Sequence, residues 1–217
     1  MNKAERLAWL PDRVIDAMAQ ACGESRDTPR EDLVIAYQMS QGLEADGWPG
    51  RKTARALYGA DVAVPRNRRA VKRAFGPMPW KKTGRGRGIK WTGANKPDIV
   101  KIDLYNGDTL RVWRPIAKEI AALFELACEA SGYVPKSTAC YVARVIGGTE
   151  RLSMHAYGIA IDFDPRLKPW GVTRSNGKPQ PIRTHAMFHQ VWEWAGWTCG
   201  GRWRDGAGDS MHIERRG

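Results

Sequence analysis

Four residues in the second half of the chain have the types and spacing needed for a metal site. His155 precedes Asp162 in one block, and Asp209 precedes His212 in another. A turn at Gly158 would bring the His155 imidazole back over the strand that carries Asp162. Two imidazoles and one carboxylate suit zinc, which at catalytic sites takes three protein ligands and leaves a fourth position for water. Asp209 is then the natural general base for such a water.

The residues around Asp162 alternate in polarity as in a β-strand. Ile159, Ile161 and Phe163 alternate with Ala160 and Asp162. This period of two predicts one apolar face against a core, with Asp162 on the opposite face.

A second strand is predicted close to the end of the chain. Met211 and Ile213 are expected to face the core, whereas His212 and Glu214 face outward. Glu214 is expected to hold the second nitrogen of a ligating histidine, as carboxylates near metal sites often do.

Each of these residues also has a structural interpretation when taken alone. A single histidine on a strand is more often structural than a ligand, and Asp162 could begin a turn at Asp164-Pro165. The two blocks together favour the metal site. His185 and His189 are assigned to an apolar helix and not to the site.

The pattern Ser-x-His-x-x-Gly-x-Ala-x-Asp over residues 153–162, followed by Gly-Gly-x-Trp and Asp-x-x-His, resembles a zinc peptidase family. That family is the D-Ala-D-Ala carboxypeptidases and L-alanyl-D-glutamate endopeptidases, which include many phage endolysins. The resemblance covers roughly Ser137 to Glu214. It implies one zinc ion bound by His155, Asp162 and His212. It also implies that Asp209 is the catalytic base.

The same family places an arginine upstream, in a Tyr-Arg or Cys-Arg pair, to bind the substrate and polarise its carbonyl. Here the segment reads Cys140-Tyr141-Val142-Ala143-Arg144, so Arg144 is the match although the pair is interrupted. Ser153 matches a position that lines the substrate cleft and is expected to help bind the substrate.

The first 62 residues predict a small three-helix domain. Helices are expected over Leu7 to Ala21, from a Thr28–Glu31 capping box to Gly42, and over Arg51 to Leu57. Gln38 with Gly42-Leu43-x-x-Asp46-Gly47-x-x-Gly50-x-x-Thr53-x-x-Ala56-Leu57 resembles a peptidoglycan-binding domain. The resemblance implies a wall-binding module, with contacts from Asp46, Gly47 and Trp48. An ordinary helical bundle with the same turn is the alternative.

Residues 63–90 predict a basic linker. Lysines, arginines, glycines and prolines are frequent there, Pro65 to Lys90 has no acidic residue, and the chain carries a net charge of +12. This charge favours an anionic partner, either anionic envelope polymers or nucleic acid. Because no nucleic-acid motif accompanies it, we expect envelope affinity and no specific nucleic-acid partner.

Residues 91–217 predict an α+β catalytic domain in which helices and a small antiparallel sheet carry the zinc site. Asn106-Gly107 predicts a hairpin between Ile99–Tyr105 and Thr109–Trp113. A helix after Pro115 has one apolar stripe. A loop from Pro165 to Pro181 is expected to form one wall of the cleft.

The four cysteines lack a close Cys-x-x-Cys pair and are expected to be reduced, with a Cys140–Cys199 disulfide left open. Neither a signal peptide nor a membrane span is predicted. We expect a monomer in the cytoplasm of the producing, infected bacterium, which acts on the periplasmic wall after release.

The resemblance implies a zinc-dependent peptidoglycan peptidase, an endolysin that hydrolyses the L-alanyl-D-glutamate bond of the peptide stem. A D-Ala-D-Ala carboxypeptidase and a non-catalytic wall-binding protein are the alternatives. A DNA-binding protein that uses the basic segment is a further one.

Overall fold

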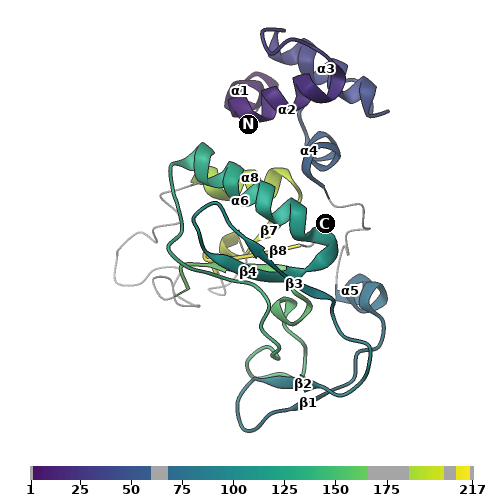
Figure 1. Cartoon of the computed structure of the whole chain (residues 1–217), viewed down its shortest axis with the longest axis vertical. Helices are drawn as coiled ribbons and strands as arrows, with labels where there is room; N and C mark the ends of the chain where they lie inside the picture. Colours follow the sequence, from purple (N-terminus) through teal and green to yellow (C-terminus); the bar gives the residue numbers. More distant parts are fainter. Residues whose placement is uncertain (1, 60–67, 166–185, 203–208, 216–217) are drawn as a thin grey trace. The chain divides into compact units, whose positions relative to one another are not determined.

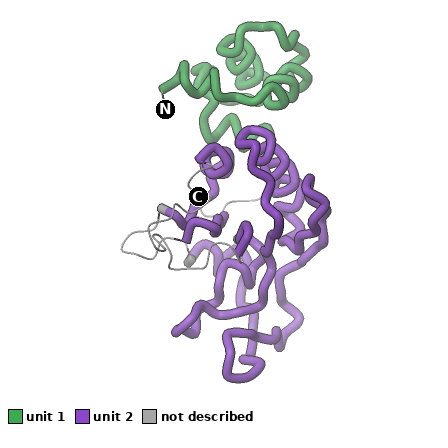
Figure 2. Tube along the Cα trace, turned by 90° about the vertical axis from the view of Figure 1, so that its left-hand side faces the viewer, with its two compact units in different colours: residues 1–60 green, residues 61–217 purple. Residues whose placement is uncertain are grey.

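The chain folds into two compact units, Met1–Ala60 and Asp61–Gly217 (Figure 2). The computed structural model describes residues 2–59, 68–165, 186–202 and 209–215. The predicted cleft loop over 166–181, the start of the predicted helix at Thr184, His185 and Trp203 lie outside the described residues.

Unit 1 is helical, and its first predicted helix is in fact two helices. Its elements are α1 (Lys3–Trp9), α2 (Asp12–Cys22), α3 (Arg30–Ser40) and α4 (Arg51–Tyr58). The break lies at Pro11, which has no N–H to donate within a helix and clashes with the preceding turn. Val14, Met18, Leu33 and Tyr37 are buried in its core.

The predicted capping box at Thr28 is wrong. Helix α3 follows Pro29 without a side-chain cap, and Glu31 binds the Lys3 ammonium at 2.6 Å. The capping box of this unit lies at α1, where Asn2 and Glu5 exchange hydrogen bonds.

The turn before α4 is held together by Gln38. Its Nε2 donates to Asp46 Oδ1 at 2.8 Å, and its Oε1 accepts from the Gly47 amide at 2.9 Å. The Trp48 amide also donates to Asp46 Oδ1, at 2.8 Å. Gly47 has a φ of +64°, which favours glycine. The motif residues therefore build the turn, and wall binding through Asp46, Gly47 and Trp48 stays a prediction.

Much of the segment predicted as a linker is folded within unit 2. It contains α5 (Arg68–Phe75) and an antiparallel hairpin of β1 (Trp80–Lys82) and β2 (Ile89–Trp91). The Ile89 amide donates to the Ala143 carbonyl at 2.9 Å. The Phe75 ring lies 4.6 Å from that of Trp113. Widely spaced apolar residues anchor this segment. They were not recognised in the sequence because most of their neighbours are basic and exposed. Residues 63–67 lie outside the described residues.

Unit 2 is α+β, with a hairpin and a four-stranded antiparallel sheet. The hairpin pairs β3 (Ile99–Asp103) with β4 (Thr109–Trp113), as predicted from Asn106-Gly107. The sheet has the order β5-β6-β8-β7. Its strands are β5 (Thr138–Ala139), β6 (Ala160–Phe163), β8 (His212–Glu214) and β7 (Thr198–Cys199).

Two helices lie side by side and supply much of the core of unit 2 (Figure 1). They are α6 (Ala117–Ser131), which follows the 3₁₀ turn η1 (Arg114–Ile116), and α8 (Ala186–Trp194). The predicted apolar stripe is confirmed, because Ile116, Ile120, Leu123, Phe124 and Ala127 are all buried.

A buried ion pair ties α6 to the residue after β8. Glu119 binds the Arg215 guanidinium and also accepts from Trp197 Nε1 at 3.0 Å. Since breaking a buried pair leaves an uncompensated charge, this contact fixes the end of β8 against the helix.

The four cysteines are free, so Cys140 and Cys199 do not pair. Among the described residues, no helix combines the length and the apolar character needed to cross a bilayer.

Candidate metal centre

The register of the four-stranded sheet brings two predicted ligands together. Asp162 of β6 lies directly opposite His212 of β8. The distance from His212 Nδ1 to Asp162 Oδ1 is 2.9 Å, and His155 Nε2 lies 3.2 Å from each of these two atoms. These three atoms converge on one point, and the three residues form a group that could hold a metal ion.

His155 reaches this point from a single 3₁₀ turn, η2 (Met154–Tyr157). The Ser153 hydroxyl caps the turn by accepting from the His155 amide at 3.3 Å. Gly158 ends the turn with a φ of +70°. A Cβ atom there would lie only 2.8 Å from the Trp113 nitrogen, so the turn packs against the β3–β4 hairpin. The turn predicted at Gly158 is confirmed.

Hydrogen bonds fix which nitrogen each imidazole presents. His155 Nδ1 lies 2.6 Å from the Cys140 carbonyl, which can only accept, so this nitrogen carries the proton and Nε2 keeps its lone pair. His212 Nε2 lies 3.3 Å from Glu214 Oε2, which leaves Nδ1 to face the cluster. Two unprotonated nitrogens and one carboxylate oxygen fit zinc, and the outer contacts match the partners that metal-bound histidines usually have.

Asp162 is held in its charged form. Burial raises its pKa, but when the two imidazoles are protonated, their hydrogen bonds and charge outweigh burial, so the pKa of Asp162 lies below its usual range. Asp162 is therefore ionised, as a metal-binding carboxylate must be, and a cation would replace the imidazole protons.

The prediction that His212 and Glu214 face outward is wrong. They lie on the face of β8 opposite Ile213, but they are only 6% and 2% exposed. Gly200, in the 3₁₀ turn η3 (Gly200–Arg202), covers this face, since a Cβ atom on Gly200 would lie 3.2 Å from that of His212.

Asp209 lies in the turn that leads into β8. Its amide donates to Gly200, and its carbonyl accepts from the His212 amide at 3.1 Å. The residue is 7% exposed, and its Oδ1 has no hydrogen-bond partner among the described residues. Burial raises the pKa of the Asp209 carboxyl to about 6, and the charge of Asp162 acts in the same direction. A carboxylate of this pKa suits proton transfer near neutral pH.

Arg144 lies within electrostatic reach of the cluster. Burial lowers its pKa, while the charges of Asp162 and Asp209 act in the opposite direction. Within the described part of the chain, its guanidinium has neither a hydrogen bond nor an ion pair. Its carbonyl accepts from the Ser153 amide at 3.0 Å, which ties it to the turn that carries His155.

Ser153 is 5% exposed, so its observed role is to cap η2, and contact with a substrate stays a prediction. His189, on α8, is not part of the cluster. Sequence patterns could not predict that the Cys140 carbonyl binds His155. Every residue has a backbone carbonyl, and only the fold decides which one lies beside the imidazole.

Residues 147–215 match the family model described as D-alanyl-D-alanine carboxypeptidase. The matched segment contains His155, Asp162 and His212 together with Asp209, whereas Arg144 lies just before it. The match supports a zinc metallopeptidase that acts on peptidoglycan. Searches of curated proteins and of solved structures found no significant match.

Proposed function

We propose that this protein is a zinc-dependent endopeptidase that hydrolyses the L-alanyl-D-glutamate bond of the peptidoglycan stem. The observation that carries the proposal is the convergence of His155, Asp162 and His212, with Asp209 beside them in the turn before β8. The match of residues 147–215 to a carboxypeptidase family supports the same chemistry.

The metal-binding residues are His155 through Nε2, His212 through Nδ1 and Asp162 through its carboxylate. When bound there, zinc supplies a Lewis acid that polarises the substrate carbonyl and makes water a better nucleophile at neutral pH. The Cys140 carbonyl and Glu214 hold the two imidazoles in the required orientation.

Asp209 is assigned the proton transfers. Its carboxylate accepts a proton from the attacking water as oxygen bonds to the carbonyl carbon, then donates that proton to the leaving nitrogen as the C–N bond breaks. The products are a new carboxylate and a new amine. Arg144 is assigned to stabilise the negative charge that develops on the carbonyl oxygen.

A D-Ala-D-Ala carboxypeptidase is the second candidate, because that activity is the description of the matching family. The two activities share one chemistry and differ in which amide bond enters the cleft. We favour the endopeptidase because residues 1–62 resemble a wall-binding module, which would hold the enzyme on an insoluble polymer as in endolysins.

We propose the same wall-binding role for unit 1, and lysis of the bacterial wall as the outcome of cleavage. The basic surface of the chain suits anionic envelope polymers, and the protein is proposed to act as a monomer. Its proposed place of action is the periplasmic wall, after release from the cytoplasm of an infected bacterium.

The proposal is tested by mass spectrometry of purified peptidoglycan after digestion. New amino termini on D-glutamate that disappear with a chelator are the expected result. Loss of terminal D-alanine alone would establish the carboxypeptidase, and intact peptidoglycan despite added zinc would leave a non-catalytic wall-binding protein. His212→Ala should abolish cleavage, whereas the control His189→Gln should retain it.

A further inference from the structure

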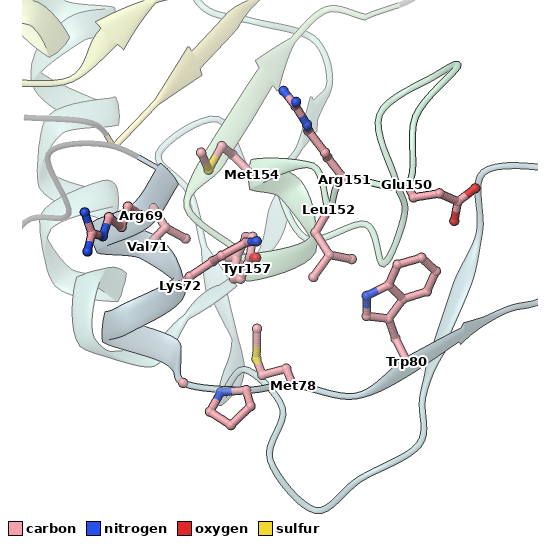
Figure 3. Close-up of a pocket in the computed structure, with 12 residues that line it drawn as sticks. Arg69, Val71, Lys72, Met78, Trp80, Glu150, Arg151, Leu152, Met154 and Tyr157 are labelled. Carbon is pink, nitrogen blue, oxygen red and sulfur yellow. The ribbon is translucent and has the colours of Figure 1, made fainter.

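A cavity of about 680 Å³ lies next to the turn that carries His155 (Figure 3). Its walls come from α5, from the segment 76–80 and from residues 150–157. The volume falls in the range of sites that bind small ligands. The first two walls lie outside the segment that matches the carboxypeptidase family, and the third lies within it.

The turn η2 separates the cavity from the metal centre. Residues three apart in a 3₁₀ helix share a face, so Met154 and Tyr157 both line the cavity. His155, between them, points to the metal centre. The cavity and the metal centre therefore lie on two sides of the same short turn.

The floor of the cavity is apolar. Met78, Trp80 and Leu152 line it together with Met154 and Tyr157, and Figure 3 shows these side chains around the open space. Met78, Met154 and Tyr157 are buried, whereas Trp80 and Leu152 remain partly accessible. Such a floor favours methyl groups and aliphatic chains over sugar hydroxyls.

The margin of the cavity is positively charged. Arg69, Lys72 and Arg151 line it, and none of them forms an ion pair within the described part of the chain. Glu150 also lines it, but Glu150 is already paired with Lys82. In Figure 3 the Lys72 side chain extends from α5 towards Tyr157. The margin thus offers cationic groups to an anionic ligand.

We propose that this cavity is a subsite for the part of the peptide stem that follows D-glutamate. That part carries carboxylates together with methyl and aliphatic side chains, and it matches an apolar floor with a cationic margin. The methyl and aliphatic groups lie on Met78 and Leu152, and a carboxylate binds Lys72. This subsite rests on the proposed function, and it would make a long stem bind more tightly than a dipeptide.

The test is the calorimetric Kd of two soluble peptides for the zinc-loaded full chain carrying Asp209→Asn, which is expected to slow cleavage enough to measure binding. One peptide is the tetrapeptide stem, and the other is the dipeptide L-alanyl-D-glutamate. Lys72→Glu is expected to weaken tetrapeptide binding roughly tenfold, the loss of about one charge-assisted contact, and to leave the dipeptide unchanged. Trp80→Ala should act in the same direction, and Lys101→Glu, an exposed change on β3, is the matched control.

An unchanged tetrapeptide Kd in both Lys72→Glu and Trp80→Ala would overturn the subsite. Binding of the wall disaccharide without peptide, if it depended on Trp80, would overturn it as well and make the glycan the ligand. Equal zinc content and circular dichroism spectra show that each variant is folded. Cleavage of the tetrapeptide by the wild-type protein is measured separately, so failure of the proposed function is distinguished from failure of the subsite.

Discussion

The chemistry of the centre depends on which atoms of each side chain remain available. His155 and His212 each use one nitrogen for an acceptor in the fold, the Cys140 carbonyl and Glu214, and present the other to the cluster. Asp162 faces both. These contacts within the fold orient the ligands, which reduces the cost of ordering them on metal binding.

Asp209→Asn is predicted to retain zinc and to lower kcat by about 100-fold or more, because a general base contributes that much to the rate. In the wild-type protein, only unprotonated Asp209 can accept a proton. Activity should therefore rise with pH up to the pKa of Asp209, which is about 6 without a metal ion. A bound cation would lower this pKa and so shift the rise in activity to lower pH. The measurement is kcat against pH together with zinc content. A wild-type rate that does not change between pH 4 and pH 7 would contradict the assignment.

Glu214→Gln is predicted to weaken zinc binding by about 10-fold to 100-fold, because an amide holds the Nε2 proton of His212 less well than a carboxylate does. Competition with a chromogenic chelator measures this affinity. Glu129→Gln, on the exposed side of α6, should leave it unchanged. Equal affinities in the two variants would show that Glu214 does not orient the ligand.

At the scale of elements, the centre depends on one short turn placed against a hairpin. η2 carries His155, Ser153 begins it, and Gly158 ends it against Trp113. The Trp113 amide donates to the Gly158 carbonyl at 3.1 Å. The pairing register of β6 and β8 places Asp162 opposite His212. The position of η2 relative to the sheet then decides whether His155 meets them.

Gly158→Ala is predicted to destabilise the fold by roughly 3 kcal/mol, through left-handed strain plus the clash of the new Cβ with Ile99 and the Trp113 backbone. Gly132→Ala is the matched control. Its φ is +64°, but a Cβ there meets no atom within 4 Å, so strain alone should cost about 1 kcal/mol. Urea unfolding measures both values. Equal destabilisation would mean that the hairpin contact does not constrain the turn.

For the whole molecule, the division into two compact units separates two proposed tasks. Unit 1 has its own apolar core and its own turn network around Gln38. Unit 2 contains the metal centre, the Glu119–Arg215 ion pair and the α5–β2 segment. Wall binding and hydrolysis are therefore expected to be separable by changes confined to one unit.

Removal of residues 1–60 is predicted to reduce sedimentation with insoluble peptidoglycan by at least about tenfold, because the second point of attachment is lost. Hydrolysis of a soluble stem peptide should stay within about twofold of the full chain, since the centre lies entirely in unit 2. Undiminished sedimentation would remove the wall-binding role from unit 1.

The sequence by itself predicted the residues of the centre and the elements that rest on local patterns. The alternation around Asp162, the turn at Gly158, the Asn106-Gly107 hairpin and the stripe on α6 all have periods set by backbone geometry. Because such patterns need only neighbouring residues, they can be read without the fold. The break at Pro11 shows the limit, since one helix was predicted from Leu7 to Ala21 where the structure has two.

Only the tertiary structure decided how those residues meet. It selected the Cys140 carbonyl as the partner of His155, set Asp162 opposite His212, and buried His212 and Glu214 beneath Gly200. It also folded much of the basic segment into unit 2, where α5 and residues 76–80 form two walls of a cavity. These outcomes depend on contacts between residues far apart in the sequence, whose energies no local pattern contains.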